Sequence, residues 1–359
     1  MTNFRLLKRT RQTTEYSCGA SALQSVLAYW GKDVDERELM KLMGTTEEEG
    51  TYPEMIAKAA RALGFEAEVK QNLTLDEVRK FTAAGHPMIA LAQVWLSEKS
   101  KAVKDEWDAG HYISVLGVDR ENVHFQDPYV RNCKAFVPRD VFEAHWHQIM
   151  GGSQTKNPKL MHLGIFIRGK RPAPVSLAKE VRLASLDFAK FGSLNLIVTK
   201  FKGRIFPLDL LEELKKLLDP GSVRANAFIM LFKDKKGRVA GMEGSGLQEA
   251  ADTAEFNALV TAVTSRMVEG RDARKTAAKA KAAAKAAAEG DFGLSTGALR
   301  AIAKRLPAGH SAAIVFFENL WERRFNEIVA THGGEVINQR LITPQALAQA
   351  AKDLVAASK

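Results

Sequence analysis

Cysteine is scarce in this sequence. The 359 residues contain two, Cys18 and Cys133, which lie far apart and form no C-x-x-C pair. Disulfide-stabilised domains and cysteine-rich zinc sites need more cysteines at closer spacing. The sequence therefore predicts neither, and any cysteine chemistry depends on a single thiol.

Long hydrophobic runs are also missing. No stretch reaches the length of about 18 apolar residues that a membrane span needs, and residues 1–17 contain basic side chains but no apolar segment of signal-peptide length. With 46% hydrophobic and 26% charged residues, the composition is that of an ordinary soluble globular protein. We therefore expect a cytoplasmic protein that does not span a membrane.

Aromatic residues are absent from the most basic segment. The formal net charge is +10, but the basic residues are spread along the chain apart from an alanine-rich cluster at Arg266–Lys285. Segments that bind single-stranded nucleic acid interleave aromatic with basic side chains. We therefore predict a solvent-exposed helix here and no nucleic-acid partner.

Clusters of metal ligands are absent as well. His145 and His147 alternate in "HWHQ" and would share one face of a strand, but no third ligand stands at a suitable spacing. The sequence therefore predicts no metal site and no cofactor.

Residues 1–169 combine helices with strands. Apolar spacing predicts helices at 20–30, 35–44, 51–65 and 74–85, followed by strands at 86–95, 111–118, 123–127 and 161–169. Helices first and an antiparallel sheet after them are typical of an α+β domain.

A second unit follows a linker at residues 170–190, where prolines and basic residues interrupt the pattern. Strand, helix and strand patterns then occur twice, at 194–201, 207–219 and 223–232 and again at 311–319, 320–334 and 335–341. Two such βαβ halves predict a ferredoxin-like α/β sandwich over residues 191–359, with a helical insertion at about 247–292.

Cys18 stands directly before a small-residue run at the start of the first predicted helix. Cysteine is nucleophilic as the thiolate, and a helix N-terminus lowers the thiol pKa. The same pattern also fits a small apolar side chain in a core. A nucleophile further needs a base, a group that orients the base, and donors for an oxyanion. The side-chain amide of Gln12, upstream of Cys18, is a candidate donor beside the Cys18 N–H.

One predicted hairpin contains a candidate base and a candidate group to orient it. His111 opens the first strand and Asp127 closes the second. If Asp119–Asn122 forms the turn, antiparallel pairing brings His111 and Asp127 to the same end of the hairpin. A carboxylate at that place can orient an imidazole.

Several ordered blocks resemble the C39-like family of bacterial papain-fold cysteine peptidases. Across Gln12–Arg168 they read "QTTEYSCGASAL", "GTYPEMIAKAARALGFEAE", "LTLDEVRKFTAAGHPMIALAQVW", "GHYISVLGVD" and "FQDPY". The resemblance implies a papain-like fold with Cys18 as nucleophile, His111 as general base and acid, Asp127 orienting His111, and Gln12 with the Cys18 N–H as the oxyanion hole. It implies hydrolysis of a peptide bond in a peptide or protein substrate. The best-known relatives are fused to peptide exporters and cut leader peptides after a double glycine; this sequence contains no transporter part, so the substrate stays open.

Other functions stay open at this stage. The papain-like unit is also compatible with a non-catalytic peptide-binding scaffold or an oligomerising structural protein, and its thiol with amidase or acyl-transferase chemistry. Over Leu194–Leu341 the second unit is similar to a bacterial domain family of uncharacterised function, and it holds no nucleophile with a base. We expect this unit to serve assembly or targeting, with homo-oligomer formation as one such role.

Overall fold

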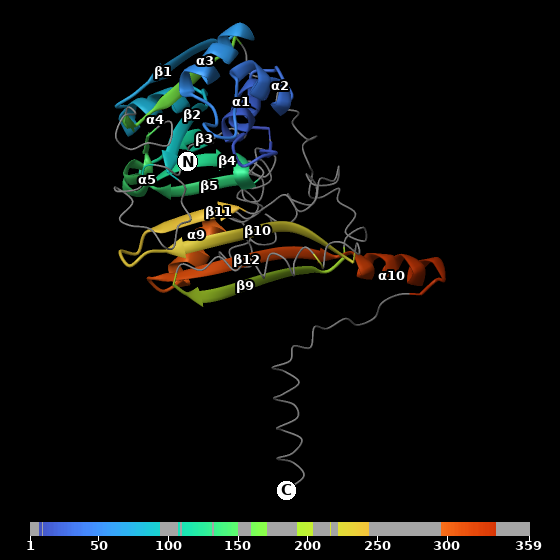
Figure 1. Cartoon of the computed structure of the whole chain (residues 1–359). Coiled ribbons are helices and arrows are strands. Elements are labelled where there is room, and N and C mark those ends of the chain that lie inside the picture. Colours follow the sequence, from blue (N-terminus) through green and yellow to red (C-terminus); the bar gives the residue numbers. More distant parts are fainter. Residues whose placement is uncertain are drawn as a thin grey trace.

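The computed structural model shows one large sheet that runs through the molecule, with helices packed against it (Figure 1). The structure describes residues 7–8, 10–93, 107, 110–130, 133–149, 159–170, 192–203, 216, 222–243 and 296–334. Across these residues, no helix combines the length and the apolar character needed to cross a membrane.

Three helices cover one face of the N-terminal half of the sheet. The first, α1 (Cys18–Tyr29), ends before Gly31, whose φ of +89° favours glycine. The second, α2 (Glu36–Met43), begins after Asp35, whose carboxylate caps the helix. The third, α3 (Pro53–Ala62), has proline at its first turn. All three predicted helices are confirmed.

Two helices lie on the opposite face. Helix α4 (Leu75–Ala83), also predicted, begins with a capping box: Thr74 Oγ1 accepts the Glu77 N–H at 3.3 Å, and the Glu77 carboxylate accepts the Thr74 N–H at 2.8 Å. Helix α5 (Arg139–His145) was not predicted, because its 7 residues are too few for a clear apolar period.

Six strands form the N-terminal half of the sheet. In their order across the sheet they are β1 (Glu66–Lys70), β8 (Gly164–Arg168), β2 (Met88–Gln93), β3 (Gly110–Val118), β4 (Asn122–Asp127) and β5 (Cys133–Pro138). Every neighbouring pair is antiparallel. The antiparallel sheet after the helices confirms the predicted α+β class, although β1 and β5 were not among the predicted strands.

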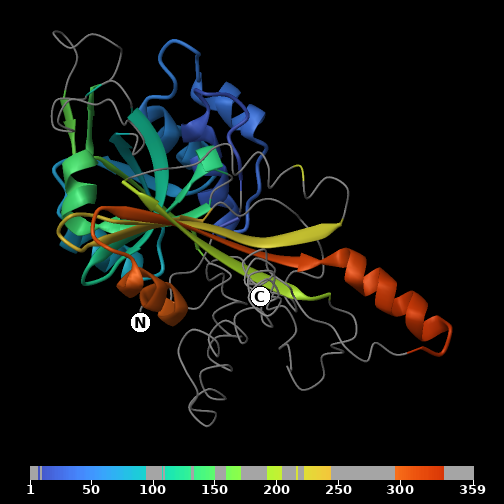
Figure 2. The ribbon, with the colours of Figure 1, turned by 90° about the horizontal axis from the view of Figure 1, so that it is seen from below.

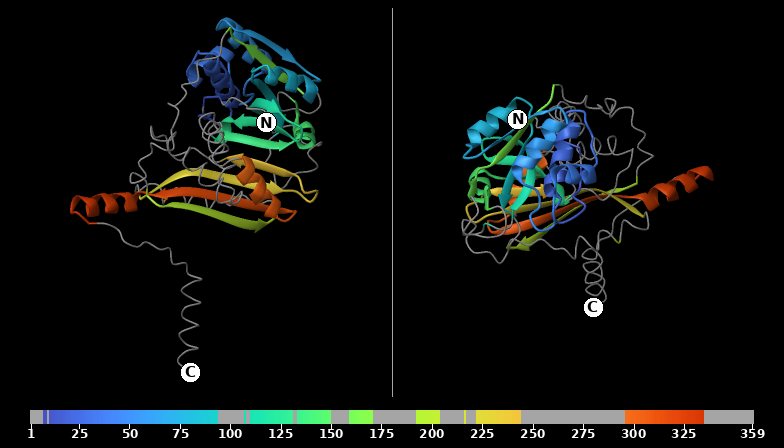
Figure 3. Two further views of the ribbon diagram at one scale, coloured as in Figure 1. Left: turned by 180° about the vertical axis from the view of Figure 1, so that it is seen from behind. Right: turned by 45° about the horizontal axis from the view of Figure 1, so that its top comes forward.

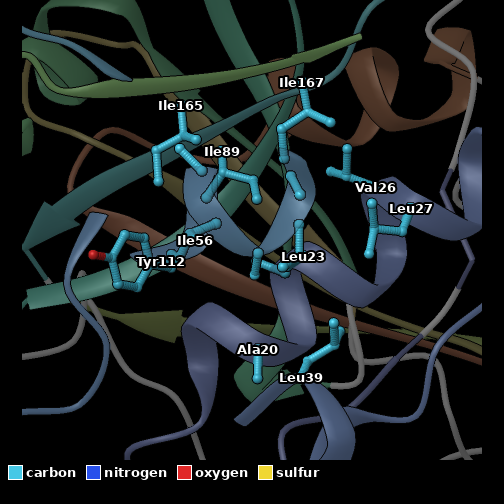
Figure 4. Packing of buried hydrophobic residues seen from close by; sticks show 14 of the residues in the cluster. Ala20, Leu23, Val26, Leu27, Leu39, Ile56, Ile89, Tyr112, Ile165 and Ile167 are labelled. Carbon is cyan, nitrogen blue, oxygen red and sulfur yellow. The ribbon is translucent and has the colours of Figure 1, made fainter. Parts of the chain in front are cut away.

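Helices on both faces bury the central strands completely. Successive side chains of a strand point to opposite faces, so in β2 Ile89 packs into the core beside α1 while Met88 packs into the core beside α4. Figure 4 shows Leu23 and Val26 of α1 directed toward Ile89 and Ile167 of the sheet. The two cores hold the strands that carry the candidate site.

The strand predicted at residues 161–169 is instead two elements. Residues Lys159–Met161 form β7, which pairs with β6 (His147–Ile149) in a small separate sheet, and β8 begins at Gly164. The break occurs because His162 has a φ of +46°, which no strand accommodates. His145 ends α5 and His147 begins β6, so they do not share a strand, and no group of three possible metal ligands occurs among the described residues.

In its described residues, the C-terminal half adds four strands and two helices. They are β9 (Leu194–Lys202), β10 (Val223–Lys233), β11 (Val239–Glu243), α9 (Thr296–Arg305), β12 (His310–Asn319) and α10 (Leu320–Thr331). Their strands run β11-β10-β12-β9, each antiparallel to its neighbour, so β9 and β10 are parallel with β12 between them. Two parallel strands separated by an antiparallel one agree with part of a ferredoxin-like sheet.

The remaining parts of that prediction lie outside the described residues. These are the helix at 207–219 apart from Lys216, the strand at 335–341, the insertion at 247–292 and the linker beyond residue 170. The ferredoxin-like fold and the domain boundaries at 169 and 191 therefore stay predictions. Helix α10 extends from the end of β12 away from the sheet (Figures 2 and 3).

Among the described residues, the sheet passes from one half to the other through the β5–β11 strand pair. In the β5–β11 ladder, Phe136 lies opposite Gly241 and Ala135 opposite Met242. This pairing makes the sheet continuous from β1 to β9 (Figure 1).

Candidate active site

Cys18 is the first residue of α1 and is partly exposed. Its N–H is therefore one of the unpaired donors of a helix N-terminus, where the helix dipole favours negative charge. The next residue has no room for a side chain: a Cβ on Gly19 would lie 3.1 Å from the Tyr112 ring and 3.2 Å from Ile56. The small residue thus lets α1 approach β3 closely, beside the thiol.

The β3–β4 hairpin has the predicted turn. Asp119 N–H donates to the Asn122 carbonyl at 2.9 Å, and the Asp119 carboxylate accepts from Glu121 N–H at 2.8 Å, Asn122 N–H at 2.7 Å and His124 Nε2 at 2.8 Å. The carboxylate therefore holds the turn closed from within. As a result, the first residues of β3 and the last residues of β4 lie at the same end of the hairpin.

His111 and Asp127 meet at that end. His111 Nε2 lies 2.7 Å from Asp127 Oδ1, and both side chains are about nine-tenths buried. The same Oδ1 accepts the Tyr129 N–H at 2.9 Å, which orients the carboxylate. Burial acts to lower the pKa of His111, but the charge and hydrogen bond of Asp127, with a smaller contribution from Cys18, hold it well above its ordinary value.

The imidazole of His111 also forms a hydrogen bond with the Cys18 thiol. Loss of water around the sulfur acts to raise the pKa of the Cys18 thiol, but the hydrogen bond with His111, the imidazole charge and backbone contacts at Tyr112 and Gly19 outweigh it. The thiol pKa therefore lies below its ordinary value. Tyr112 stays protonated, because burial and the nearby Cys18 charge raise its pKa well above the ordinary value. The arrangement favours a thiolate beside an imidazolium.

Gln12 is buried in the segment that leads to Cys18. Its N–H donates to the Pro128 carbonyl at 3.1 Å, which attaches this segment to the residue after Asp127. Its side-chain Nε2 donates to the carbonyls of Thr14 at 2.9 Å and Glu15 at 3.4 Å. The Oε1 atom is buried and accepts no hydrogen bond from any described residue. The structure thus brings Gln12 to the site's loop, with its amide engaged in the turn before Cys18.

A pair of buried glutamines beside His111 was missed by the sequence reasoning. Gln93 Nε2 donates to the Gln148 side chain and, at 2.9 Å, to the His147 carbonyl. The Gln148 amide lies over Gly110, where a Cβ would be 2.3 Å from its Nε2. The one sequence signal was the glycine directly before His111, which alone names no partner.

The part of the chain that holds these residues is similar to known proteins. Residues 7–151 match the Peptidase C39 family. An uncharacterised protein of Methanothermobacter marburgensis is 31% identical over 132 residues, which are 37% of this chain and 78% of that protein. The chain belongs to the Peptidase C39 family. The matched range includes Gln12, Cys18, His111 and Asp127.

Other C39 relatives are larger than the matched region. The transport/processing ATP-binding protein ComA of Streptococcus pneumoniae is 29% identical over 136 residues, or 38% of this chain, and the match spans only 17% of ComA. The lactococcin transport/processing ATP-binding protein LcnC-like of Lactococcus lactis is 28% identical over 144 residues, or 40% of this chain and 18% of that protein.

Solved structures of similar proteins cover just under half of this chain. The peptidase domain of Streptococcus ComA is 21% identical, with a TM-score of 0.34 over 46% of this chain and 99% of that domain. A double glycine motif protease from an AMS/PCAT transporter, in complex with the leader peptide, is 18% identical, with a TM-score of 0.33 over 47% of this chain and 96% of that one.

Proposed function

We propose that this chain is a cysteine peptidase in which Cys18 is the nucleophile, His111 the general base and acid, and Asp127 the residue that orients His111. The observation that carries this proposal is the buried contact of 2.7 Å between His111 Nε2 and Asp127 Oδ1, next to a thiol whose pKa is lowered by the same imidazole. Membership of the Peptidase C39 family supports it.

The reaction has two steps in this arrangement. The Cys18 thiolate attacks the carbonyl carbon, and His111 gives its proton to the leaving amine as the carbon–nitrogen bond breaks. A water then loses its proton to His111 and attacks the thioester, which releases the carboxylate product and regenerates the thiol. Asp127 keeps His111 in the tautomer and orientation that both proton transfers need.

The oxyanion in each step needs donors. The Cys18 N–H at the start of α1 is one, since no earlier turn of the helix uses it. We assign the second to Gln12, whose amide Nε2 is buried in the loop before Cys18. The Cys18 N–H, held by the helix, stabilises the developing charge without having to reorient, whereas Gln12 Nε2 first has to leave the carbonyls of Thr14 and Glu15.

The substrate is a peptide segment in our proposal. The ComA and lactococcin relatives are named as transport/processing proteins, and one solved relative is bound to a leader peptide. A leader-type segment ending in two glycines is therefore the first probe to use. Because a nucleophilic thiol must stay reduced, we place the activity in the cytoplasm.

The decisive experiment pairs turnover with trapping. The full chain is incubated with a peptide library that includes double-glycine leader sequences, and the products are weighed by mass spectrometry. Two new chain ends that depend on Cys18 support the peptidase. Loss of an amide nitrogen without scission would favour an amidase instead, and peptides captured by both the parent and Cys18→Ala without any turnover would favour a binding scaffold.

For the C-terminal half we propose a role in assembly, with a second copy of this chain as partner. Support comes from α10, where Trp321, Phe325 and Ile328 lie at i, i+4 and i+7 on one face and are each more than half exposed. Light scattering of Phe325→Glu tests this role, because a charge on that face would convert an oligomer to a smaller species. A parent chain that is monomeric at high concentration would contradict the assembly role.

A further inference from the structure

Strand β5 lies between the candidate site and the C-terminal half. On one side it pairs with β4, where its first residue, Cys133, is opposite Asp127. On the other side it pairs with β11, through Phe136 with Gly241 and Ala135 with Met242. The strand beside Asp127 is thus held in place by a hairpin that follows about 100 residues later in the chain.

A hydrophobic core of each half contacts residues of the other half across this junction. Phe136 of β5 packs against the C-terminal core, which includes Leu231 and Phe316. Ala240 and Met242 of β11 pack in return against the N-terminal core. Each of these two cores therefore includes packing from residues of the other half of the chain.

Gly241 shows how closely the strands fit. A Cβ at this position would lie 2.6 and 2.7 Å from the Phe136 ring atoms Cε1 and Cζ, and 2.9 Å from Leu231 Cδ2. Atoms that close must move apart. A side chain at 241 would therefore displace β5 or its ring.

Arg238, at the turn of the β10–β11 hairpin, adds a polar link. Its guanidinium pairs with Asp140 of α5 and, at 2.8 Å from Nε, with Asp234 of its own hairpin. A half-exposed pair of this kind contributes little free energy. Its geometry nevertheless ties the hairpin to the helix that directly follows β5.

We propose that the β10–β11 hairpin is a positioning element of the active site, which sets the place of β5 and thereby of Asp127 at the end of β4. This inference rests on the proposed Cys18–His111–Asp127 site. The C-terminal half is then a working part of the peptidase rather than an appended module. Close-packed strands transmit such a displacement because they have no free volume to absorb it.

The test uses the full chain with Cys133→Ser, so that Cys18 is the single thiol. The rate of Cys18 alkylation by iodoacetamide is measured from pH 4 to 10 for the parent, Gly241→Ala and the double variant Gly241→Ala/Phe136→Leu. In Gly241→Ala we expect the midpoint of the pH–rate profile for Cys18 alkylation to rise by about half a pH unit. At acidic pH this corresponds to a fall of about threefold in the fraction of thiolate. Leucine lacks the ring atoms that the new Cβ meets, so the double variant should return toward the parent profile.

A second pair of variants covers the case in which Gly241→Ala does not fold. Arg238→Ala should shift the midpoint in the same direction by less, and Arg238→Lys should restore part of it. The matched control is Arg323→Ala, which removes the exposed pair of Arg323 with Glu327 on α10 and should leave the profile unchanged.

The outcomes separate this inference from the proposed function. A parent chain with an ordinary thiol midpoint overturns the peptidase site itself. A parent with a lowered midpoint, together with folded Gly241→Ala and Arg238→Ala variants that keep it, overturns the positioning role alone.

Discussion

His111 Nε2 and Asp127 Oδ1 lie 2.7 Å apart although 16 residues separate them in the chain. One hairpin accounts for this contact, because its turn at Asp119 places the start of β3 and the end of β4 side by side. The pair is buried, so the carboxylate acts on the imidazole with little screening by water. The same relationship lowers the thiol pKa of Cys18 through His111.

Replacement of His111 by alanine should remove the stabilisation of the thiolate. The factors that lower the Cys18 pKa are led by the hydrogen bond with His111, whereas burial raises it. In His111→Ala the midpoint of Cys18 alkylation should therefore rise to that of an ordinary thiol or above, near pH 8.5 to 9. Iodoacetamide kinetics across this range measure it. A midpoint that stays low would show that the helix N-terminus alone is sufficient.

Asp127→Asn should lower the pKa of His111. Burial lowers the His111 pKa and Asp127 raises it, so removal of the carboxylate charge should make His111 lose its proton at a lower pH. The imidazole resonances of His111, followed by NMR, report this shift. His124, which pairs with Asp119, serves as the internal control, and its resonances at pH 7 should match those of the parent.

Gln12→Ala should separate oxyanion stabilisation from thiol activation. Loss of one oxyanion donor typically lowers kcat by about 10²–10³-fold. Alkylation by iodoacetamide forms no oxyanion, so its rate should stay within about twofold of the parent rate. A parallel fall in both rates would instead indicate that Gln12 only maintains the loop through its bonds to Thr14 and Glu15.

Gly19→Val should destabilise the fold beside the site. The first added carbon meets Tyr112, Ile56 and Thr51 at 3.1 to 3.3 Å, and valine adds two further methyl groups beyond it. Overpacking of this kind costs about 1–3 kcal/mol of the free energy of unfolding, which denaturant titration measures. Ala62→Val, at an exposed position of α3, is the matched control and should lower the free energy of unfolding by about a few tenths of a kcal/mol at most.

Asp119→Asn should weaken the hairpin in a pH-dependent way. Partial burial acts to raise the Asp119 pKa, but hydrogen bonds from His124, Asn122 and Glu121 hold it well below its ordinary value. Because the folded-state pKa is lowered, this carboxylate stabilises the fold above about pH 4 and ceases to do so as the pH falls further. The variant should lose about 1 kcal/mol near neutral pH. Thermal unfolding at pH 7 and pH 3 checks it, and an equal loss at both would contradict the role of the charge.

Local features of the chain were readable from the sequence. The helix that starts at Cys18 and the turn at Asp119–Asn122 depend on neighbouring residues, so apolar spacing and turn chemistry sufficed to predict them. From that hairpin it followed that His111 and Asp127 would share one end. Short elements such as α5 and β1 were missed, because a few residues carry no distinct period.

What only the tertiary structure decided is which distant segments lie together. The glutamine pair over Gly110, the use of the Gln12 amide in its own turn, and the pairing of β5 with β11 depend on side chains and backbone far apart in sequence. A strand's pattern of apolar residues shows which face is buried but not which strand its edge will bind, since backbone hydrogen bonds are the same for every partner. The proposed nucleophile, Cys18, was therefore identified from its local sequence, whereas the pairing of β5 with β11 depends on packing that reaches across both halves of the chain.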